Sequence, residues 1–145
     1  MKYTIIFAFL LVLISANKVF ACKCAPPLGK NEKEIVTKAK EKSAVVFSGK
    51  VTNIIGRSDG TVEVKFQVET AWKGKSFKVF SVFTIDPKTC CFCGFNFRIG
   101  EKYIVYAYGN EKPSTSTCTR TKIFENAGKD KKYLGKPISF ITAKS

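Results

Sequence analysis

The sequence predicts a mainly β domain in which five antiparallel strands curve into a small closed barrel, flanked by one or two short helices. Three features of the 145 residues support this fold class. Apolar and polar residues alternate with the period of a strand over several segments, and turn-forming residues separate those segments at short intervals. A single clear helical pattern precedes them. Small antiparallel barrels of this kind close their sheet on itself and fill the interior with side chains.

Residues 1–21 have the three parts of a secretory signal peptide. Lys2 supplies a basic start, residues 5–16 are an apolar run (IIFAFLLVLISA), and Val19-Phe20-Ala21 provides suitable residues before a cleavage site. The run is too short to cross the roughly 30 Å of membrane hydrocarbon as a helix. We therefore expect cleavage and a secreted, extracellular protein, periplasmic or at the cell surface in a bacterium; a buried N-terminal helix is the alternative. Residues 22–145, which contain no linker or repeat, are expected to form a single domain.

The first part of that domain is expected to be extended and then helical. Residues 22–30 (CKCAPPLGK) contain two prolines, which fix φ and disfavour helix at the preceding residue. Asn31 is a suitable N-cap for a helix at 32–42. This helix has two glutamates in its first turn and two lysines in its last, an order that the helix dipole favours.

Strands are expected in five segments of the chain. The clearest is 61–72, in which apolar residues alternate with Glu, Lys and Gln. A turn at 56–60 that contains Gly, Ser and Asp connects it to the preceding strand as a hairpin. The expected strands are 44–55, 61–72, 77–85, 103–108 and 115–124, followed by a weak helix or turn at 126–132.

The composition excludes most kinds of catalytic site. The chain has no histidine, so it has no Ser-His-Asp triad, Cys-His dyad, Cys2His2 finger or histidine-ligated catalytic metal. It also has no glycine-rich phosphate loop, and its 11 acidic residues are dispersed along the sequence. We therefore predict that the protein is not an enzyme and has no cofactor.

Six cysteines in a secreted domain of this size are expected to form disulfides, for which fifteen pairings are possible. Cys22 and Cys24 are too close to bridge each other usefully, so both must pair with cysteines further along the chain. Each such bond would close a loop of about 70 to 95 residues and stabilise the fold by roughly 4 kcal/mol in the chain-entropy model. The alternative is a thiolate cluster of Cys22, Cys24 and the Cys-Cys-Phe-Cys run at 90–93 that binds zinc or copper(I).

Several short motifs together resemble one protein family. Cys22-Lys23-Cys24 stands directly after the predicted cleavage site and is followed by a proline-containing segment. Further along are Trp72-Lys73-Gly74 after the hairpin, Cys93-Gly94, the run GEKYIVYA at 100–107, and Cys118. Over most of residues 22–126 this pattern resembles the inhibitory N-terminal domain of the tissue inhibitors of metalloproteinases (TIMPs), an OB-fold barrel of the netrin-like (NTR) group. The chain would be a short, single-domain member.

The resemblance implies the disulfides Cys22–Cys93 and Cys24–Cys118, and it implies a mechanism. In that family, the α-amino nitrogen and carbonyl oxygen of the first cysteine bind the catalytic zinc of a target metalloproteinase and displace its water. An α-amine loses its proton at little cost beside Zn²⁺, because its pKa in peptides is about 7.7–8.0. Cys22 is therefore the residue expected to bind the zinc of the target.

The resemblance also assigns neighbouring residues to the protease contact. Lys23 would enter the S1′ pocket of the protease, where the family usually has a small hydroxyl residue. An unpaired buried lysine is costly, so a suitable target would have an acidic or open S1′ site. The other residues that the resemblance places in the contact are Cys24, Ala25 and Pro26, which would continue along the cleft, and Cys91 and Phe92, which would lie beside Cys22.

Cys90 and Cys91 have no counterpart in the family. Three states are open to them: a bond between these two neighbours, pairing between chains, or free thiols. A third bridge common in the animal inhibitors is missing, because no cysteine occurs between Cys24 and Cys90.

The positive charge supports a different function. The chain has 25 Lys and Arg against 11 acidic residues; without Lys2 and Lys18 of the leader, 23 against 11 leaves a net charge of +12. OB-folds bind oligosaccharides and oligonucleotides, and a basic domain attracts polyanions. The alternative is therefore a basic extracellular binding module for a glycan, another polyanion or a protein, with no inhibitory activity and no specific nucleic-acid partner.

Two other interpretations apply to the N-terminal cysteines. Cys22 and Cys24 can be purely structural, or Cys22 can be lipid-modified, which would block both its amine and its thiol. In either function we expect a monomer without a transmembrane segment.

Overall fold

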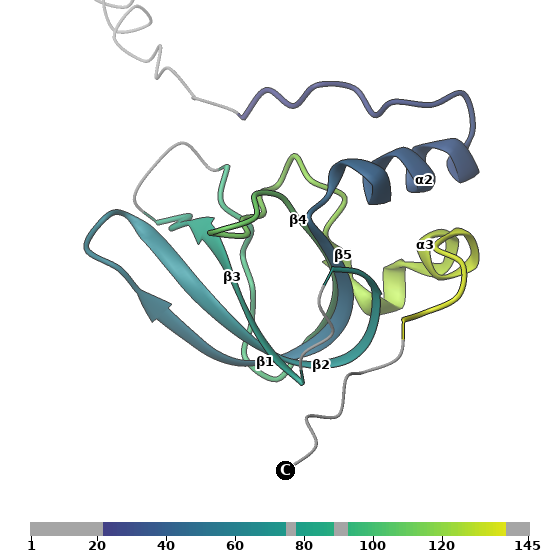
Figure 1. Cartoon of the computed structure of the whole chain (residues 1–145). Helices are drawn as coiled ribbons and strands as arrows, with labels where there is room; N and C mark the ends of the chain where they lie inside the picture. Colours follow the sequence, from purple (N-terminus) through teal and green to yellow (C-terminus); the bar gives the residue numbers. More distant parts are fainter. Residues whose placement is uncertain (1–21, 75–77, 89–92, 139–145) are drawn as a thin grey trace, which may run out of the picture.

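The computed structural model describes residues 22–74, 78–88 and 93–138, and the expected leader lies outside them. The protein is mainly β, as its sequence predicts, with one helix before the first strand and two short helices after the last. No helix among the described residues is long and apolar enough to cross a membrane. In chain order the elements are α2 (Glu32–Lys42), β1 (Val45–Gly56), β2 (Thr61–Lys73), β3 (Val79–Ile85), β4 (Lys102–Ala107), β5 (Lys122–Ile123), the 3-10 helix η1 (Phe124–Asn126) and α3 (Gly128–Tyr133) (Figure 1).

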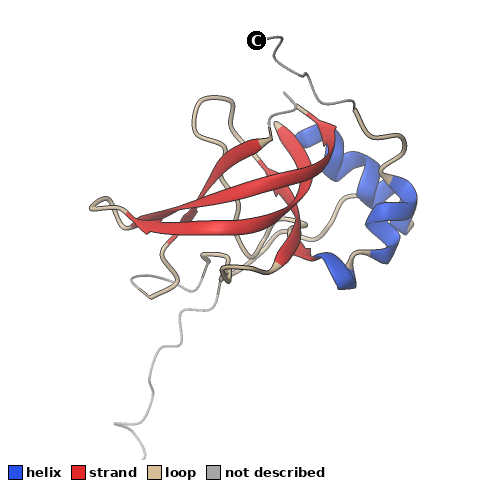
Figure 2. Cartoon of the chain, turned by 90° about the horizontal axis from the view of Figure 1, so that it is seen from below, coloured by secondary structure: helices blue, strands red, loops and turns tan. Residues whose placement is uncertain are grey.

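The strands form one antiparallel sheet in the order β3-β2-β1-β4-β5. β1 and β2 make a long hairpin, and the other edge of β1 pairs with β4. The register between β1 and β2 shifts at three places, and such irregularities increase the local bend of a strand. The sheet is accordingly strongly curved (Figures 1 and 2).

The sheet is not closed, so the complete barrel that the sequence predicts is not shown. A short segment around Ser114 nevertheless connects β3 to the chain after β4. Ser114 forms isolated bridges with Phe83 of β3 and with Tyr108. The Phe83 N–H donates to the carbonyl of Pro113 over 2.9 Å, and the Thr115 N–H donates to the carbonyl of Phe83 over 2.8 Å.

Both faces of the central strands β1 and β4 are buried. Successive side chains of a strand point to opposite faces, so each strand contributes to two separate clusters. One face carries an aromatic cluster whose neighbouring rings meet edge to face at centroid distances of 4.9 to 5.3 Å: Phe47, Phe66, Phe97 and Tyr103. The opposite face packs under α2 and α3 and includes Val46, Ile104 and Tyr106 of the sheet with Val36, Trp72 and Leu134. The two helices therefore cover the second face of the sheet (Figure 2).

The prediction of a fifth strand at 115–124 is largely wrong. Only the two residues of β5 pair with β4, and η1 follows directly. The hydroxyl of Thr115 bonds to those of Thr119 and Thr121, each over 2.7 Å, and the Thr121 hydroxyl accepts a bond from the Tyr106 N–H. These side-chain bonds compete with a strand ladder, so the segment turns instead of extending.

The predicted helix at 32–42 is confirmed, and its N-terminus is capped as expected. The side-chain oxygen of Asn31 accepts a hydrogen bond from the N–H of Glu34 over 2.9 Å. The weak helix or turn predicted at 126–132 corresponds to the end of η1 and to α3.

A buried carboxylate joins α3 to the sheet. Asp130 is 1% exposed. It accepts hydrogen bonds from the Tyr106 hydroxyl (2.7 Å) and the Nε of Arg120 (2.5 Å), and forms an ion pair with Lys122 (3.0 Å). Arg120 also binds Glu32, the first residue of α2, over 2.8 Å. One arginine therefore connects both helices to the chain that precedes β5.

The contacts in this network favour the charged forms of its two carboxyl groups, Asp130 and Glu32. Burial alone would raise the pKa of Asp130, but the hydrogen bonds that it accepts, foremost from Arg120, outweigh burial and lower the pKa below its ordinary value. The hydrogen bond from Arg120 likewise lowers the pKa of Glu32. Burial raises the pKa of Tyr106, and the negative charge of Asp130 raises it further. The Tyr106 hydroxyl therefore keeps its proton and donates it in the hydrogen bond to Asp130. A carboxyl group with a lowered folded pKa stabilises the protein above its unfolded pKa, and this contribution is lost as the pH falls through the folded pKa.

Replacing the buried carboxylate tests this network. Asp130→Asn is expected to lower the free energy of unfolding by about 3 kcal/mol at pH 7, because Arg120 loses its buried counter-ion. Urea unfolding at pH 7 measures the loss. The difference from wild type should shrink as the pH falls below 3.8, the ordinary value for Asp, because the carboxyl of the unfolded wild-type chain then binds a proton before that of the folded protein does. Glu111→Gln, at an exposed carboxylate, should change stability by less than about 0.5 kcal/mol. A difference between Asp130→Asn and wild type that does not depend on pH would contradict the assignment.

Candidate functional site

The segment Cys22–Leu28 forms neither helix nor strand and leads into α2 (purple in Figure 1). Apart from its first residue, which is half-buried, all of its residues are exposed. Its two prolines keep it from joining the helix. Gly29 then lets the chain pass close to α2: its φ is 144°, and a Cβ at this position would come within 2.9 Å of Cγ1 of Ile35.

Two disulfides hold this segment to the rest of the protein. Cys22 is bonded to Cys93 and Cys24 to Cys118, with Cα–Cα distances of 5.2 and 5.1 Å. These are the two pairs that the family resemblance implies. The sulfurs of Cys22 and Cys118 are 3.5 Å apart, so the two disulfides are adjacent. The alternative of a zinc or copper(I) thiolate cluster is wrong for Cys22, Cys24 and Cys93, because sulfurs in disulfides offer no thiolate.

Cys93 is fixed by the end of β3. A Cβ at the neighbouring Gly94 would lie 1.9 Å from the carbonyl oxygen of Ile85, so only glycine permits this approach. The N–H of Phe95 donates to the hydroxyl of Thr84 over 2.9 Å, and Thr84 is only 2% exposed. The backbone on the C-terminal side of Cys93 therefore has a defined position against the sheet.

Cys118 is fixed by its own loop and by the neighbouring backbone of Cys93. The N–H of Thr117 donates to the carbonyl of Cys93 over 3.0 Å, which joins the two segments that carry the distal cysteines. The N–H of Cys118 donates to the hydroxyl of Ser116 over 3.2 Å. Two residues further on, Arg120 binds Asp130 as described above. Both disulfides therefore end on structured backbone.

Five of the seven residues predicted to contact a protease lie in the part of the chain that the structure describes, and their role in that contact stays a prediction. The predicted residues Cys22 to Pro26 are consecutive in the exposed segment. Lys23 has no hydrogen bond or ion pair with another described residue, so its side chain is available to a partner. Cys90, Cys91 and Phe92 lie outside the described residues, so the contact predicted for Cys91 and Phe92 and the state of Cys90 and Cys91 stay predictions.

Sequence patterns alone do not identify the residues that fix Cys118. The alternating threonines of TSTCTRT at 115–121 are typical of a strand, but the structure uses their hydroxyls as a buried hydrogen-bonding group. Arg120 and Asp130 are ten residues apart in a lysine-rich region, where nothing distinguishes them from surface charges. Their partnership depends on how α3 packs against β4.

The arrangement offers an extended, exposed peptide whose ends cannot move far. Such a segment can lie in the cleft of another protein like a bound peptide, because its backbone is not used by any strand ladder. Comparison of the chain with models of protein families and with curated proteins finds no match. The disulfides, the exposure of the segment and the charges around it are therefore the observations from which a function is inferred.

Changing Gly94 tests how Cys93 is positioned. Gly94→Ala is expected to lower the free energy of unfolding by about 1–3 kcal/mol, because the added methyl group must displace the backbone at Ile85. Urea unfolding with both disulfides intact measures the change. Gly128→Ala is the matched control: apart from its chain neighbours and the backbone of its own helix, no described atom lies within 4 Å of a Cβ there, so this change should be neutral or slightly stabilising. Equal stabilities of the two variants would show that the close approach at Gly94 is not required.

Proposed function

We propose that this protein is a secreted inhibitor of zinc metalloendopeptidases that resembles the N-terminal domain of the TIMPs. The observation that carries the proposal is the exposed segment that starts at Cys22 and is crosslinked at both Cys22 and Cys24. In this proposal the leader at 1–21 is removed, so that Cys22 becomes the first residue and carries a free α-amine.

The inhibitory group would be the main chain of Cys22. A catalytic zinc has three protein ligands and one position open to water or substrate. The α-amino nitrogen and the carbonyl oxygen of Cys22 would together replace the water that the protease uses for hydrolysis, which would make the zinc five-coordinate. The two disulfides favour this binding, because a segment that is already held loses less conformational entropy when it docks.

The residues that follow would determine which protease is bound. Lys23 is exposed and has no partner among the described residues, so it suits an S1′ pocket that is acidic or open to solvent. Ala25 and Pro26 are exposed beside it and would continue along the cleft. Cys91 and Phe92 are proposed to contact the protease because they directly precede Cys93 in the sequence.

The fold of the proposed inhibitor is a closed OB barrel. The bridges that Ser114 makes with Phe83 of β3 and with Tyr108 after β4 support closure, because they connect one edge of the sheet to the chain on its other side. The five-strand antiparallel order and the curvature of the sheet support the same proposal.

The second candidate function is a basic extracellular binding module without inhibitory activity. The observation that favours it is the net charge of +12 without the leader (23 basic against 11 acidic residues), together with three exposed lysines on α3: Lys129, Lys131 and Lys132. Binding of a polyanion through such residues would be sensitive to salt, because it depends on screened charge.

The α-amine provides the decisive test. A chain that begins at Cys22 is expected to inhibit zinc metalloendopeptidases, and a chain with one alanine added before Cys22 should inhibit at least about 100-fold less, or about 2.8 kcal/mol. The added residue turns the amine into an amide, whose nitrogen is not a zinc ligand. Residual protease activity against inhibitor concentration gives the constants, and intact mass verifies the first residue of each chain.

The control for this experiment carries the same alanine after Ser145 and should inhibit as well as the unmodified chain. Equal potency of the two N-terminal forms would exclude zinc binding by Cys22. If neither form inhibits any protease while both bind heparin with an affinity that collapses in salt, the binding module is the better description.

A further inference from the structure

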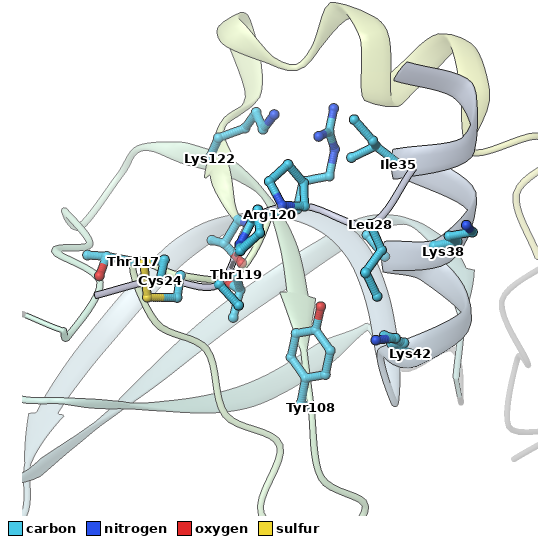
Figure 3. Close-up of a pocket in the computed structure, with 16 residues that line it drawn as sticks. Cys24, Leu28, Ile35, Lys38, Lys42, Tyr108, Thr117, Thr119, Arg120 and Lys122 are labelled. Carbon is cyan, nitrogen blue, oxygen red and sulfur yellow. Dashed lines mark hydrogen bonds between the residues drawn. A yellow bond between two sulfur atoms is a disulfide. The ribbon is translucent and has the colours of Figure 1, made fainter. Parts of the chain in front are cut away.

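A groove of about 670 Å³ separates the N-terminal segment from α2 and from the chain at Thr117–Lys122 (Figure 3). Sites for small organic molecules typically have volumes of about 300–1,000 Å³. One wall consists of the side chains from Ala25 to Leu28, and the facing wall includes Ile35 and Ala39 of α2. These two walls are therefore largely aliphatic, whereas the third side of the groove, at Thr117–Lys122, is mostly polar.

All charged side chains that line the groove are cationic. Lys38 and Lys42 lie on α2, while Arg120 and Lys122 lie on the opposite side (Figure 3). Arg120 and Lys122 are both ion-paired to Asp130. Lys38 and Lys42 are exposed, and neither has an ion pair with another described residue. The edge of the groove along α2 thus carries two positive charges without a counter-ion.

Two further side chains suit a ligand with an apolar part and an acceptor group. Leu28 is 52% exposed on the wall of the groove, so a bound hydrocarbon chain would cover it. Tyr108, just after β4, directs its side chain toward the groove (Figure 3). Its hydroxyl has no hydrogen bond with any other residue that the structure describes, and can donate to an anionic group.

We infer that this groove binds a free fatty acid, with the carboxylate at Lys38 and Lys42 and the hydrocarbon chain against Leu28 and Ile35. An anionic polymer would use the lysines but leave the aliphatic walls exposed to water. A lipid bilayer presents a broad surface that does not enter a groove. The combination of aliphatic walls and an unpaired cationic edge favours a small molecule that has both an apolar chain and an anionic head.

The probe is dodecanoate, kept below the concentration at which it forms micelles. Calorimetric titration of the protein with both disulfides intact should show saturable binding of one molecule per chain. The variant Lys38→Gln/Lys42→Gln should bind about tenfold more weakly at low salt. The control Lys33→Gln/Lys50→Gln removes the same charge from two exposed lysines that do not line the groove, and its affinity should stay within about twofold of wild type. Dodecyltrimethylammonium, with the same chain and a cationic head, should bind at least about tenfold more weakly than dodecanoate.

Three results would overturn the inference. Equal losses in the two double variants would show that general attraction to a basic protein explains the binding. Equal affinity for the cationic and anionic amphiphiles would show that the lysines do not select the head group. Binding to anionic phospholipid vesicles without binding to monomeric dodecanoate would identify a membrane surface as the ligand. The chain with an alanine before Cys22 keeps the groove and should bind dodecanoate normally, so this site and the inhibitory function fail independently.

Discussion

Crosslinking of Cys22 and Cys24 to cysteines 71 and 94 residues away is the constraint on which the proposed site depends. A disulfide that closes a loop of this length stabilises the folded state by roughly 4 kcal/mol in the chain-entropy model. The more important consequence here is local. A segment of seven residues, Cys22–Leu28, has no helix or strand of its own, yet it is bonded at two points to backbone that is itself fixed. Gly94 packs against the end of β3 on one side, and the bonds around Cys118 and Arg120 hold the other. Exposure and a defined position are thereby combined in one segment.

The helices also help to fix the position of the N-terminal segment. α2 and α3 cover the face of β1 and β4 that carries Ile104 and Tyr106, and the Arg120–Asp130 pair joins them to the chain that holds Cys118. Because α2 also starts where the N-terminal segment ends, the helix forms a wall beside that segment and creates the groove. One packing arrangement therefore produces both surfaces for which we propose a role. A partner protein would contact the N-terminal end of the segment, and a small ligand would use the side that faces α2.

The elements that could be predicted from the sequence are those whose pattern is local. The helix at 32–42 has its cap, its charge order and its apolar side within the twelve residues from Asn31 to Lys42, and the hairpin at 44–72 has clear alternation around a turn. Alternation alone does not say which set of residues faces the core. In β3, Val82 and Thr84 are buried while Val79 and Ile85 are exposed, because pairing with β2 fixes the face. The segment 115–124 has strand-like alternation too, but its hydroxyls find partners in each other and in β4, and most of it turns.

The pattern of residues alone establishes a basic, mainly β domain that lacks histidine, with an extended N-terminal segment and cysteines that must pair over long distances. It did not determine the pairing of those cysteines, since the entropy of closing a loop changes only slowly with its length and long loops of similar size are nearly equivalent. The fold selects the pairing, because Cys93 and Cys118 lie side by side, where the Thr117–Cys93 hydrogen bond holds their backbones together. It also decided which charges are neutralised: Asp130 is buried beside Arg120, while Lys38 and Lys42 are left at the edge of a groove that exists only once the segment and α2 have packed.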